Sequence, residues 1–303
     1  MGCPVVSVIV PSYNHAQFLE QRLESILKQT FQDFELIILD DLSPDNSRNI
    51  IEKYRQHPKV SHIVYNEKNS GSTFFQWNKA VFELAQGQFI WIAESDDVAE
   101  PTLLETLVTP MQAQPKIAVA YCQSTRMNAC GEVTGDWLSH TSDLTNPTQF
   151  QQAFSMQGTA FINQYLVYKN TIPNASAVVF NANTYRKVGG AQPSLRTNGD
   201  WDLWFKMLLL GDVFYTPEQL NHFRYHDASV IAKEDQRDQT KRSRRLHKKK
   251  MYQYGFDVRA SMHNAMLSCQ QSSLDAFKIN KKRKQKNKKH IIWLSFLVKL
   301  MPA

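Results

Sequence analysis

The sequence predicts an α/β fold, with a mostly parallel central sheet flanked by helices and a basic C-terminal tail. Two observations predict the sheet. Short apolar runs rich in β-branched residues alternate with segments of helical spacing, and polar residues follow each run directly. A strand–helix–strand order gives parallel strands with the helices packed on the faces of the sheet. The tail is indicated by a shift to basic composition beyond about residue 233.

The first 122 residues contain the regular part of this pattern. The expected strands are residues 5–10, 36–39, 60–65, 89–93 and 118–122. The expected helices are residues 18–27, 47–54, 72–84 and 101–114. Ser72 is a typical N-cap, Gly87 follows the third helix as a stop, and Pro101 suits the first turn of the fourth. Because parallel sheets bind ligands at the carboxyl ends of their strands, the residues after each strand are the candidates for a site.

The remainder of the chain is less regular. Residues 123–170 suggest an insertion with a hairpin at Gly131, followed by a strand at 175–180 and a helix at 201–210. We expect one large domain over residues 1–232, with two parts that meet at about residue 122. Residues 233–303 form the tail, which we expect to be helical or disordered.

Composition sets further bounds. The chain has 303 residues, 42% of them hydrophobic and 21% charged, as in an ordinary globular protein. A net charge of +7 favours anionic partners. The four cysteines form no C-x-x-C pair, so free thiols in a reducing compartment are expected rather than a zinc knuckle. No signal-peptide pattern and no spanning apolar run stands out, which favours a cytoplasmic location.

The first strand ends in Pro11-Ser12-Tyr13-Asn14. A dinucleotide-binding fold would have G-x-G-x-x-G here, so a nicotinamide or flavin enzyme is disfavoured. Tyr13 could stack on a nucleobase or simply pack against the next helix.

Carboxylates follow the second and fourth strands. Asp40-Asp41 could accept hydrogen bonds from a base or ribose, or be a solvated pair beside a helix cap. Glu94-Ser95-Asp96-Asp97 is strongly anionic, and a divalent cation would let it approach a diphosphate. The alternative is an acidic cap for the helix that begins at Pro101.

Together these segments resemble family 2 glycosyltransferases of the A-type fold. The resemblance is carried by Val-Ile-Val-Pro-Ser-Tyr-Asn at 8–14, Leu-Asp-Asp-Leu-Ser at 39–43 and Glu-Ser-Asp-Asp at 94–97, and extends over about residues 5–230. It implies a single A-type catalytic domain over residues 1–232, with a nucleotide-binding half up to about 122 and an acceptor half over about 123–232. It assigns the donor nucleotide to five positions: Pro11, Tyr13, Asn14, Asp41 and Asp96. It makes Asp97 the metal ligand of a D-x-D motif whose first position here is Glu94, a further candidate ligand.

Two later segments also match the family. Asn198-Gly199-Asp200-Trp201-Asp202-Leu203-Trp204 resembles E-D-x-D-x-W, with Gly199 in place of the glutamate. The resemblance implies that Asp200 is the general base, with Asp202 a further candidate, although Asp200 could also be a helix N-cap. Arg224-Tyr225-His226-Asp227-Ala228-Ser229 resembles R-x-H-x-x-S, which suggests His226 as a metal ligand or diphosphate contact.

The implied reaction is inverting transfer of a hexose from a nucleotide-diphosphate donor, most commonly a UDP-sugar, with bound Mn²⁺ or Mg²⁺. The acceptor would be a glycan or a lipid-linked sugar. Two alternatives remain, a nucleotidyltransferase and a non-catalytic binding protein of the same fold. A glycoside hydrolase fits the strand-end acids less well.

The tail combines the basic run 281–289 with the apolar stretch 291–301. This pattern suggests attachment to an acidic membrane surface, as a peripheral protein, or a solvated disordered end. Nucleic acid is not an expected partner because the tail lacks interleaved aromatic residues and a groove-reading motif.

Overall fold

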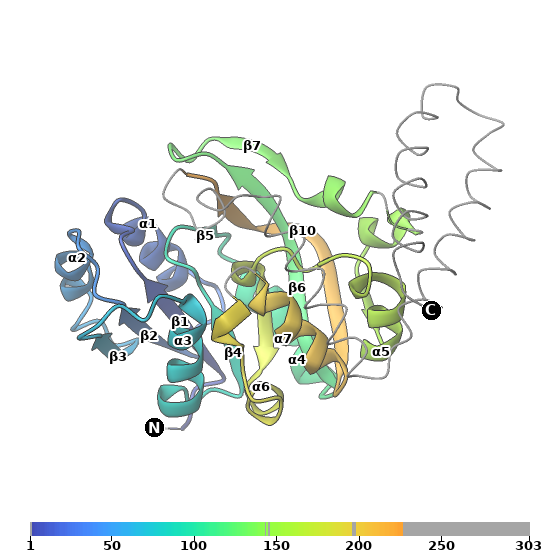
Figure 1. The fold of residues 1–303 in the computed structure, drawn as a ribbon, viewed down its shortest axis with the longest axis horizontal. Helices are drawn as coiled ribbons and strands as arrows, with labels where there is room; N and C mark the ends of the chain where they lie inside the picture. The colour runs from blue at the N-terminus through green and yellow to red at the C-terminus, as the bar shows by residue number, and fades with distance from the viewer. Residues whose placement is uncertain (1, 143, 145, 196–197, 227–303) are drawn as a thin grey trace.

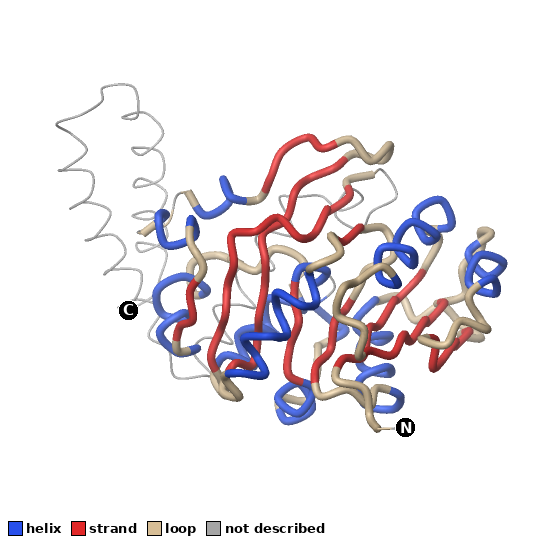
Figure 2. Tube along the Cα trace, turned by 180° about the vertical axis from the view of Figure 1, so that it is seen from behind, coloured by secondary structure: helices blue, strands red, loops and turns tan. Residues whose placement is uncertain are grey.

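A computed structural model of the chain describes residues 2–142, 144, 146–195 and 198–226. Its centre is a sheet in the order β3-β2-β1-β4-β9-β6-β10-β5, with β7 paired to β6 and β8 to β10. Helices α3 and α7 cover the face seen in Figure 1, and α4 covers the opposite face seen in Figure 2. The mixed α/β architecture that the sequence predicts is confirmed.

The N-terminal half of the sheet is parallel. It consists of β1 (Val6–Ser12), β2 (Phe34–Asp40), β3 (Val60–Tyr65) and β4 (Phe89–Ile92). Every residue of β1, β2 and β4 is buried, because helices cover both faces of these strands. The four strands confirm the apolar runs found in the sequence.

Two apolar cores lie on the two faces of the sheet. The first four helices are α1 (Ala16–Leu27), α2 (Ser47–Lys53), α3 (Thr73–Lys79), which continues as the π-helix η1 (Ala80–Leu84), and α4 (Leu103–Ala113). Phe74 and Trp77 of α3 pack into one core, and Leu19 of α1 and Leu107 of α4 pack into the other. The alternation of β1 side chains, with Ile9 in one core and Val8 in the other, follows from the two-residue period of a strand.

The C-terminal half of the sheet is mixed. It contains β5 (Val98–Ala99), β6 (Ile117–Met127), β7 (Val133–Asp136), β8 (Phe154–Met156), β9 (Val178–Asn181) and β10 (Asp212–Arg224). β9 runs antiparallel to both β4 and β6, whereas β10 runs parallel to β6. β10 was not predicted from the sequence, and its pairing extends β6 five residues beyond the predicted end at 122.

The second half also holds short helices. They are α5 (Gly158–Phe161), the π-helix η4 (Ile162–Leu166), α6 (Ala182–Lys187), α7 (Gly199–Leu208) and the 3₁₀ turns η2 (Leu138–Thr141), η3 (Pro147–Gln151), η5 (Ala175–Ala177) and η6 (Pro193–Leu195). The expected hairpin at Gly131 is confirmed as the β6–β7 connection. Residues 123–170 are more regular than predicted, because β8, α5 and η4 pack against β10 and α7.

The expected domain boundary at 232 and the basic tail lie outside the described residues. Within those residues, no helix combines the length and the apolar character that crossing a bilayer requires.

Candidate active site

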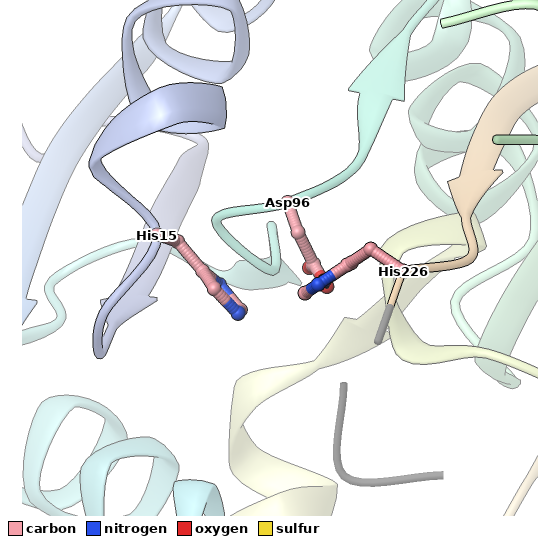
Figure 3. Close-up of side chains that lie close together, drawn as sticks. All are labelled: His15, Asp96 and His226. Atoms are coloured by element: carbon pink, nitrogen blue, oxygen red, sulfur yellow. The ribbon is translucent and has the colours of Figure 1, made fainter. Parts of the chain in front are cut away.

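A carboxylate and two imidazoles converge at the carboxyl ends of three strands. His15 follows β1, Asp96 follows β4 and His226 follows β10, and Figure 3 shows their side chains pointing toward one another. One ligand atom from each lies within 4.8 Å of the others. His226 Nε2 is 3.0 Å from Asp96 Oδ2, and His15 Nδ1 is 2.8 Å from Ser95 Oγ. Oxygen and imidazole nitrogen are donors that suit a divalent metal ion.

Asp96 is the ionised member of the acidic turn. Its burial raises the pKa, but the contact with His226 and the charge of the two imidazoles outweigh burial and hold the pKa below the usual value. Asp96 therefore stays a carboxylate, which is the form that ligates a metal.

Asp97 faces the protein interior instead. It is 2% exposed, and its Oδ1 accepts a hydrogen bond of 2.9 Å from the backbone nitrogen of Arg224. Burial and the charge of Asp96 raise the pKa of Asp97 to about 7, opposed by the charge of Arg22. The adjacent acids thus point to different surroundings, and the structure brings Asp96, not Asp97, together with His226.

Glu94 lies between the acidic turn and α3. Its Oε1 accepts hydrogen bonds from Trp77 Nε1 at 2.9 Å and Thr73 Oγ1 at 3.2 Å. Burial, with the charge of Asp96, raises the pKa of Glu94 to about 8. At neutral pH this side chain is mostly protonated, which makes it a weak metal ligand but a good hydrogen-bond donor.

The acidic turn is fixed by two arginines that were not predicted as site residues. Arg224 donates to backbone and side-chain oxygens around the turn, namely Asp96 O, Asn128 O, Ala129 O and Gln21 Oε1. Arg22 is fully buried, and its guanidinium carbon lies 4.8 Å from the centroid of the Trp91 ring. Burial lowers the pKa of Arg22 to about 10, although the charges of Asp97, Asp96 and Glu94 raise it. The guanidinium therefore remains cationic at neutral pH.

Asp41 follows β2 and is saturated with donors from the protein. Its carboxylate accepts hydrogen bonds from Asn66 Nδ2 at 2.7 Å, Gln76 Nε2 at 2.9 Å and the amide and hydroxyl of Ser70. These bonds hold the segment between β3 and α3 against the end of β2. A ligand that bonds to Asp41 must share or displace one of these donors.

The remaining donor-side candidates lie in the two loops after β1 and β2. Pro11 is buried in β1, whereas Tyr13 is 48% exposed at the loop surface. Asn14 and Leu42 both have the left-handed φ angles, 57° and 61°, that residues other than glycine rarely adopt. The amide of Asn14 donates to Ser43 Oγ at 3.0 Å, which joins the two loops. Backbone strain of this kind gathers at functional sites.

Asp200 lies in the first turn of α7. Its Oδ1 accepts from the amide of Trp201 at 2.7 Å and its Oδ2 from Asn170 Nδ2 at 3.3 Å. Burial raises the pKa of Asp200 to about 7, which suits a group that must take a proton near neutral pH. Asp202 faces elsewhere and pairs with Lys206 at 3.3 Å.

Gly199 occupies the position at which the family motif has a glutamate, and the structure leaves little room for a side chain there. A Cβ atom built at Gly199 would lie 2.4 Å from the ring of Phe74, so α3 occupies the space that a side chain there would need. Phe74 packs edge-on against Trp77, whose indole bonds to Glu94. The start of α7 and the acidic turn are therefore joined through two aromatic rings.

His15 was not predicted from the sequence, although it directly follows the Pro-Ser-Tyr-Asn segment. Its position after a strand was the available signal. Asn170 gave no such signal, because it lies in a connection and does not follow the end of a predicted strand.

Comparison with known proteins agrees with this geometry. The family model described as Glycosyl transferase family 2 matches residues 7–169. TuaG of Bacillus subtilis strain 168, whose name places it in teichuronic acid biosynthesis, is 29% identical over 212 residues, which cover 70% of this chain and 75% of TuaG. GlyG of Streptococcus pneumoniae is 26% identical over 60% of this chain and 69% of its own.

Solved structures share the fold. TarS 1–349 of S. aureus in complex with UDP-GlcNAc gives a TM-score of 0.60 at 19% identity, over 76% of this chain and 61% of that one. A mannosyltransferase of Pyrobaculum calidifontis in complex with GDP-Man and Mn²⁺ gives a TM-score of 0.56 at 15% identity, over 98% of this chain and 87% of the mannosyltransferase chain. This chain thus spans about three fifths of the TarS fragment. By its family match and by its A-type fold, this chain belongs to glycosyl transferase family 2 and is a glycosyltransferase.

Proposed function

We propose that the chain is a metal-dependent, inverting hexosyltransferase that uses a nucleotide-diphosphate sugar and delivers the sugar to a glycan or lipid-linked hydroxyl. The observation that carries the metal dependence is the cluster of His15, Asp96 and His226 at the carboxyl end of the parallel sheet. Family membership favours glycosyl transfer over nucleotidyl transfer, the alternative left open by the sequence.

The cluster fits a divalent cation. Asp96 is ionised, and His226 Nδ1 is buried without a hydrogen-bond partner among the described residues. We therefore assign the carboxylate ligand to Asp96 rather than Asp97, and retain His226. A cation bound there would offset the negative charge that develops on the leaving diphosphate. Mn²⁺ accepts mixed oxygen and imidazole ligands, whereas Mg²⁺ prefers oxygen, so Mn²⁺ is the better match.

The protein side of the reaction rests on Asp200. As a carboxylate it accepts the proton of the acceptor hydroxyl while that oxygen attacks the anomeric carbon from the face opposite the nucleotide. Asn170 orients its Oδ2, and the amide of Trp201 at the start of α7 holds its Oδ1. A single displacement of this kind inverts the configuration at the anomeric carbon.

The donor base would lie over the loops after β1 and β2. The exposed ring of Tyr13 is available for stacking. That Asp41 binds the edge of the base stays a prediction. It requires that Asn66, Gln76 or Ser70 share or give up its hydrogen bond to Asp41, so that the carboxylate can accept one from the base. The TarS structures contain UDP and UDP-GlcNAc, and the Pyrobaculum enzyme contains GDP-Man, so uridine and guanosine are the bases to compare first. Membrane attachment through the tail likewise stays a prediction.

Thermal unfolding with UDP, GDP and dTDP, each with and without Mn²⁺, tests the proposal. A nucleotide at about 100 times its dissociation constant stabilises the fold by about 2.7 kcal/mol. We expect one nucleotide to raise the melting temperature of the wild type only when Mn²⁺ is present.

Three isosteric variants locate the metal ligand. Asp96→Asn should lose the metal-dependent shift, while Asp97→Asn should lower the basal melting temperature yet keep most of the shift. Asp202→Asn is the control, since Asp202 is paired with Lys206. Loss of the shift in Asp97→Asn with retention in Asp96→Asn would return the ligand role to Asp97. No shift with any nucleotide in the wild type would refute the proposal.

A further inference from the structure

An aromatic group lies beside the candidate metal cluster and is not used by the mechanism above. Trp137 follows β7, and Phe223 and Tyr225 lie at the end of β10. The rings of Trp137 and Tyr225 are nearly parallel, at 22° with centroids 6.4 Å apart, and Phe223 packs edge-on against both. Tyr225 is 37% exposed. We call Trp137, Phe223 and Tyr225 the aromatic platform.

The guanidinium of Arg126 lies against this platform. Its guanidinium carbon is 4.3 Å from the centroid of the Trp137 ring. Among the residues that the structure describes, no carboxylate forms an ion pair with Arg126, and its Nε is buried with no hydrogen-bond partner. The indole Nε1 of Trp137 is likewise buried and unpartnered within that part of the chain. Two such donors side by side are unusual, because native proteins satisfy nearly all buried polar groups.

Two other arginines differ from Arg126 in what surrounds their charge. Arg22 also lacks hydrogen-bond partners among the described residues, but the charges of Asp97, Asp96 and Glu94 act on it. Arg224 directly follows Phe223 of the platform, and its side chain donates to four oxygens at 2.7–3.3 Å. The guanidinium of Arg126 forms no hydrogen bond of this kind with any residue that the structure describes. Its charge is therefore available to a ligand.

The platform is linked to both parts of the proposed site. On one side, the ring of His140 packs edge-on against Trp137 at 5.2 Å, and His140 Nε2 is 3.0 Å from Asn170 O. Asn170 in turn donates to Asp200, the proposed base. On the other side, Tyr225 directly precedes His226 of the metal cluster. The platform is therefore linked to the proposed base through His140 and Asn170, and to the metal cluster through the backbone of residues 225 and 226.

We infer that Tyr225, Trp137 and Arg126 form an acceptor subsite for a sugar that carries an anionic group. The sugar ring packs on the aromatic rings, and its carboxylate or phosphate pairs with the guanidinium of Arg126. Ligand sites commonly combine apolar and aromatic walls with a few polar groups that fix orientation, and a guanidinium binds such anions through paired hydrogen bonds. The inference deepens the proposed function and rests on it.

Saturation-transfer NMR on the full chain with UDP and Mn²⁺ tests the subsite. The probes are methyl β-glucoside, methyl β-glucuronoside and glucose 6-phosphate, which compare a neutral ring with a carboxylate and a phosphate. We expect at least one anionic probe to bind about tenfold more tightly than the glucoside, the change that one charge-assisted hydrogen bond supplies. The stronger of the two anionic probes identifies the source of the charge.

Matched variants separate the charge from the ring. Arg126→Gln should abolish the preference for the anionic probe, whereas Arg48→Gln should keep it, since Arg48 also stacks on an aromatic ring, Tyr65, but far from the site on α2. Tyr225→Leu should weaken the binding of all three probes, whereas Tyr225→Phe should still bind the glucoside.

The outcomes distinguish this inference from the proposed function. If the wild type shows the nucleotide- and metal-dependent thermal shift but no preference for either anionic probe, the subsite is refuted and the proposed function stands. The same holds if Arg126→Gln keeps the preference, or if Tyr225→Leu binds the glucoside as the wild type does. If no nucleotide shifts the wild type, the proposed function fails first.

Discussion

The two halves of the sheet contribute to the site in different ways. In the parallel half, β1 to β4, the candidate residues lie at the end of a buried strand, as Tyr13 and Asp41 do, or in the turn that follows it, as Asp96 does. In the mixed half they lie on a connection, on the first turn of a helix and at the end of a long strand, as Asn170, Asp200 and His226 do. In the parallel half, the position of a site residue follows from the strand just before it in the sequence. In the mixed half, it depends on contacts between segments that are distant in the sequence.

The largest expected effect tests the mixed half. Asp200→Asn should lower the rate of nucleotide release from the donor by about 10³-fold, within the range that loss of a general base produces. Burial raises the pKa of Asp200 to about 7, so Asp200 is protonated and cannot act as a base at lower pH. The wild-type rate should therefore be low below about pH 7 and increase as the pH rises through that value. Steady-state kinetics over about pH 5–9, roughly two units either side of that pKa, would measure both. An active, pH-insensitive Asp200→Asn enzyme would contradict the assignment.

The next effect tests the parallel half, where Arg22 balances the acids. Arg22→Met should reduce the free energy of unfolding by about 3 kcal/mol, because it leaves the buried Asp97 and its neighbours without a compensating charge. Arg22→Lys keeps the charge but loses the flat contact with Trp91, and should cost less. Urea denaturation at pH 7 would compare the two. If both variants lose the same free energy of unfolding, Arg22 stabilises the fold by its packing and not by its charge.

A smaller effect tests the contact that joins the two halves. Gly199→Ala should destabilise the fold by about 2 kcal/mol, because the new methyl group would overlap the ring of Phe74. In a Phe74→Leu background the same change should cost less, and a double-mutant cycle would give the coupling. Strict additivity of the two changes would mean that α3 and α7 adjust independently.

The smallest effect concerns strain in the parallel half. Leu42 has a φ of 61° and is half exposed, so Leu42→Gly should relieve about 1 kcal/mol of backbone strain. The greater freedom of glycine in the unfolded chain offsets part of that gain, leaving a net stabilisation of under about 1 kcal/mol. Thermal unfolding would detect it, and a lower melting temperature would show that the side chain of Leu42 packs more favourably than its exposure suggests.

The same contrast explains how much could be predicted. Strands β1 to β4 and the helices up to α4 follow from hydrophobic periodicity, because each is a complete apolar run or an amphipathic segment, whereas the two-residue strand β5 was not predicted. β10 was missed because Pro217, Glu218 and Gln219 interrupt its pattern, where the pairing with β6 shifts register. β10 pairs with β6 on both sides of this interruption, and a pairing between such distant segments leaves no local signal in the sequence.

Within the site, the residue types were easier to predict than the partners. Asp96 and Asp97 are neighbours with similar motif matches, yet one turns toward His226 and the other toward the amide of Arg224. Those partners are 130 and 127 residues away in the chain. Sequence spacing could not decide between the two acids, because the choice depends on where β10 ends.

The shifts of register in β10 have a consequence for chain length. After them, Arg224 and His226 are buried while Tyr225 is exposed, in the alternation of an extended chain. Residues 217, 218 and 220 have no partner on β6, so a deletion among them shortens the irregular segment and leaves the later pairing in place. A deletion inside the paired run 221–224 would instead move every later side chain to the opposite face, turning Tyr225 inward and the arginine and histidine outward. We therefore expect changes of length to be tolerated in the irregular segment and not in the four residues that follow it.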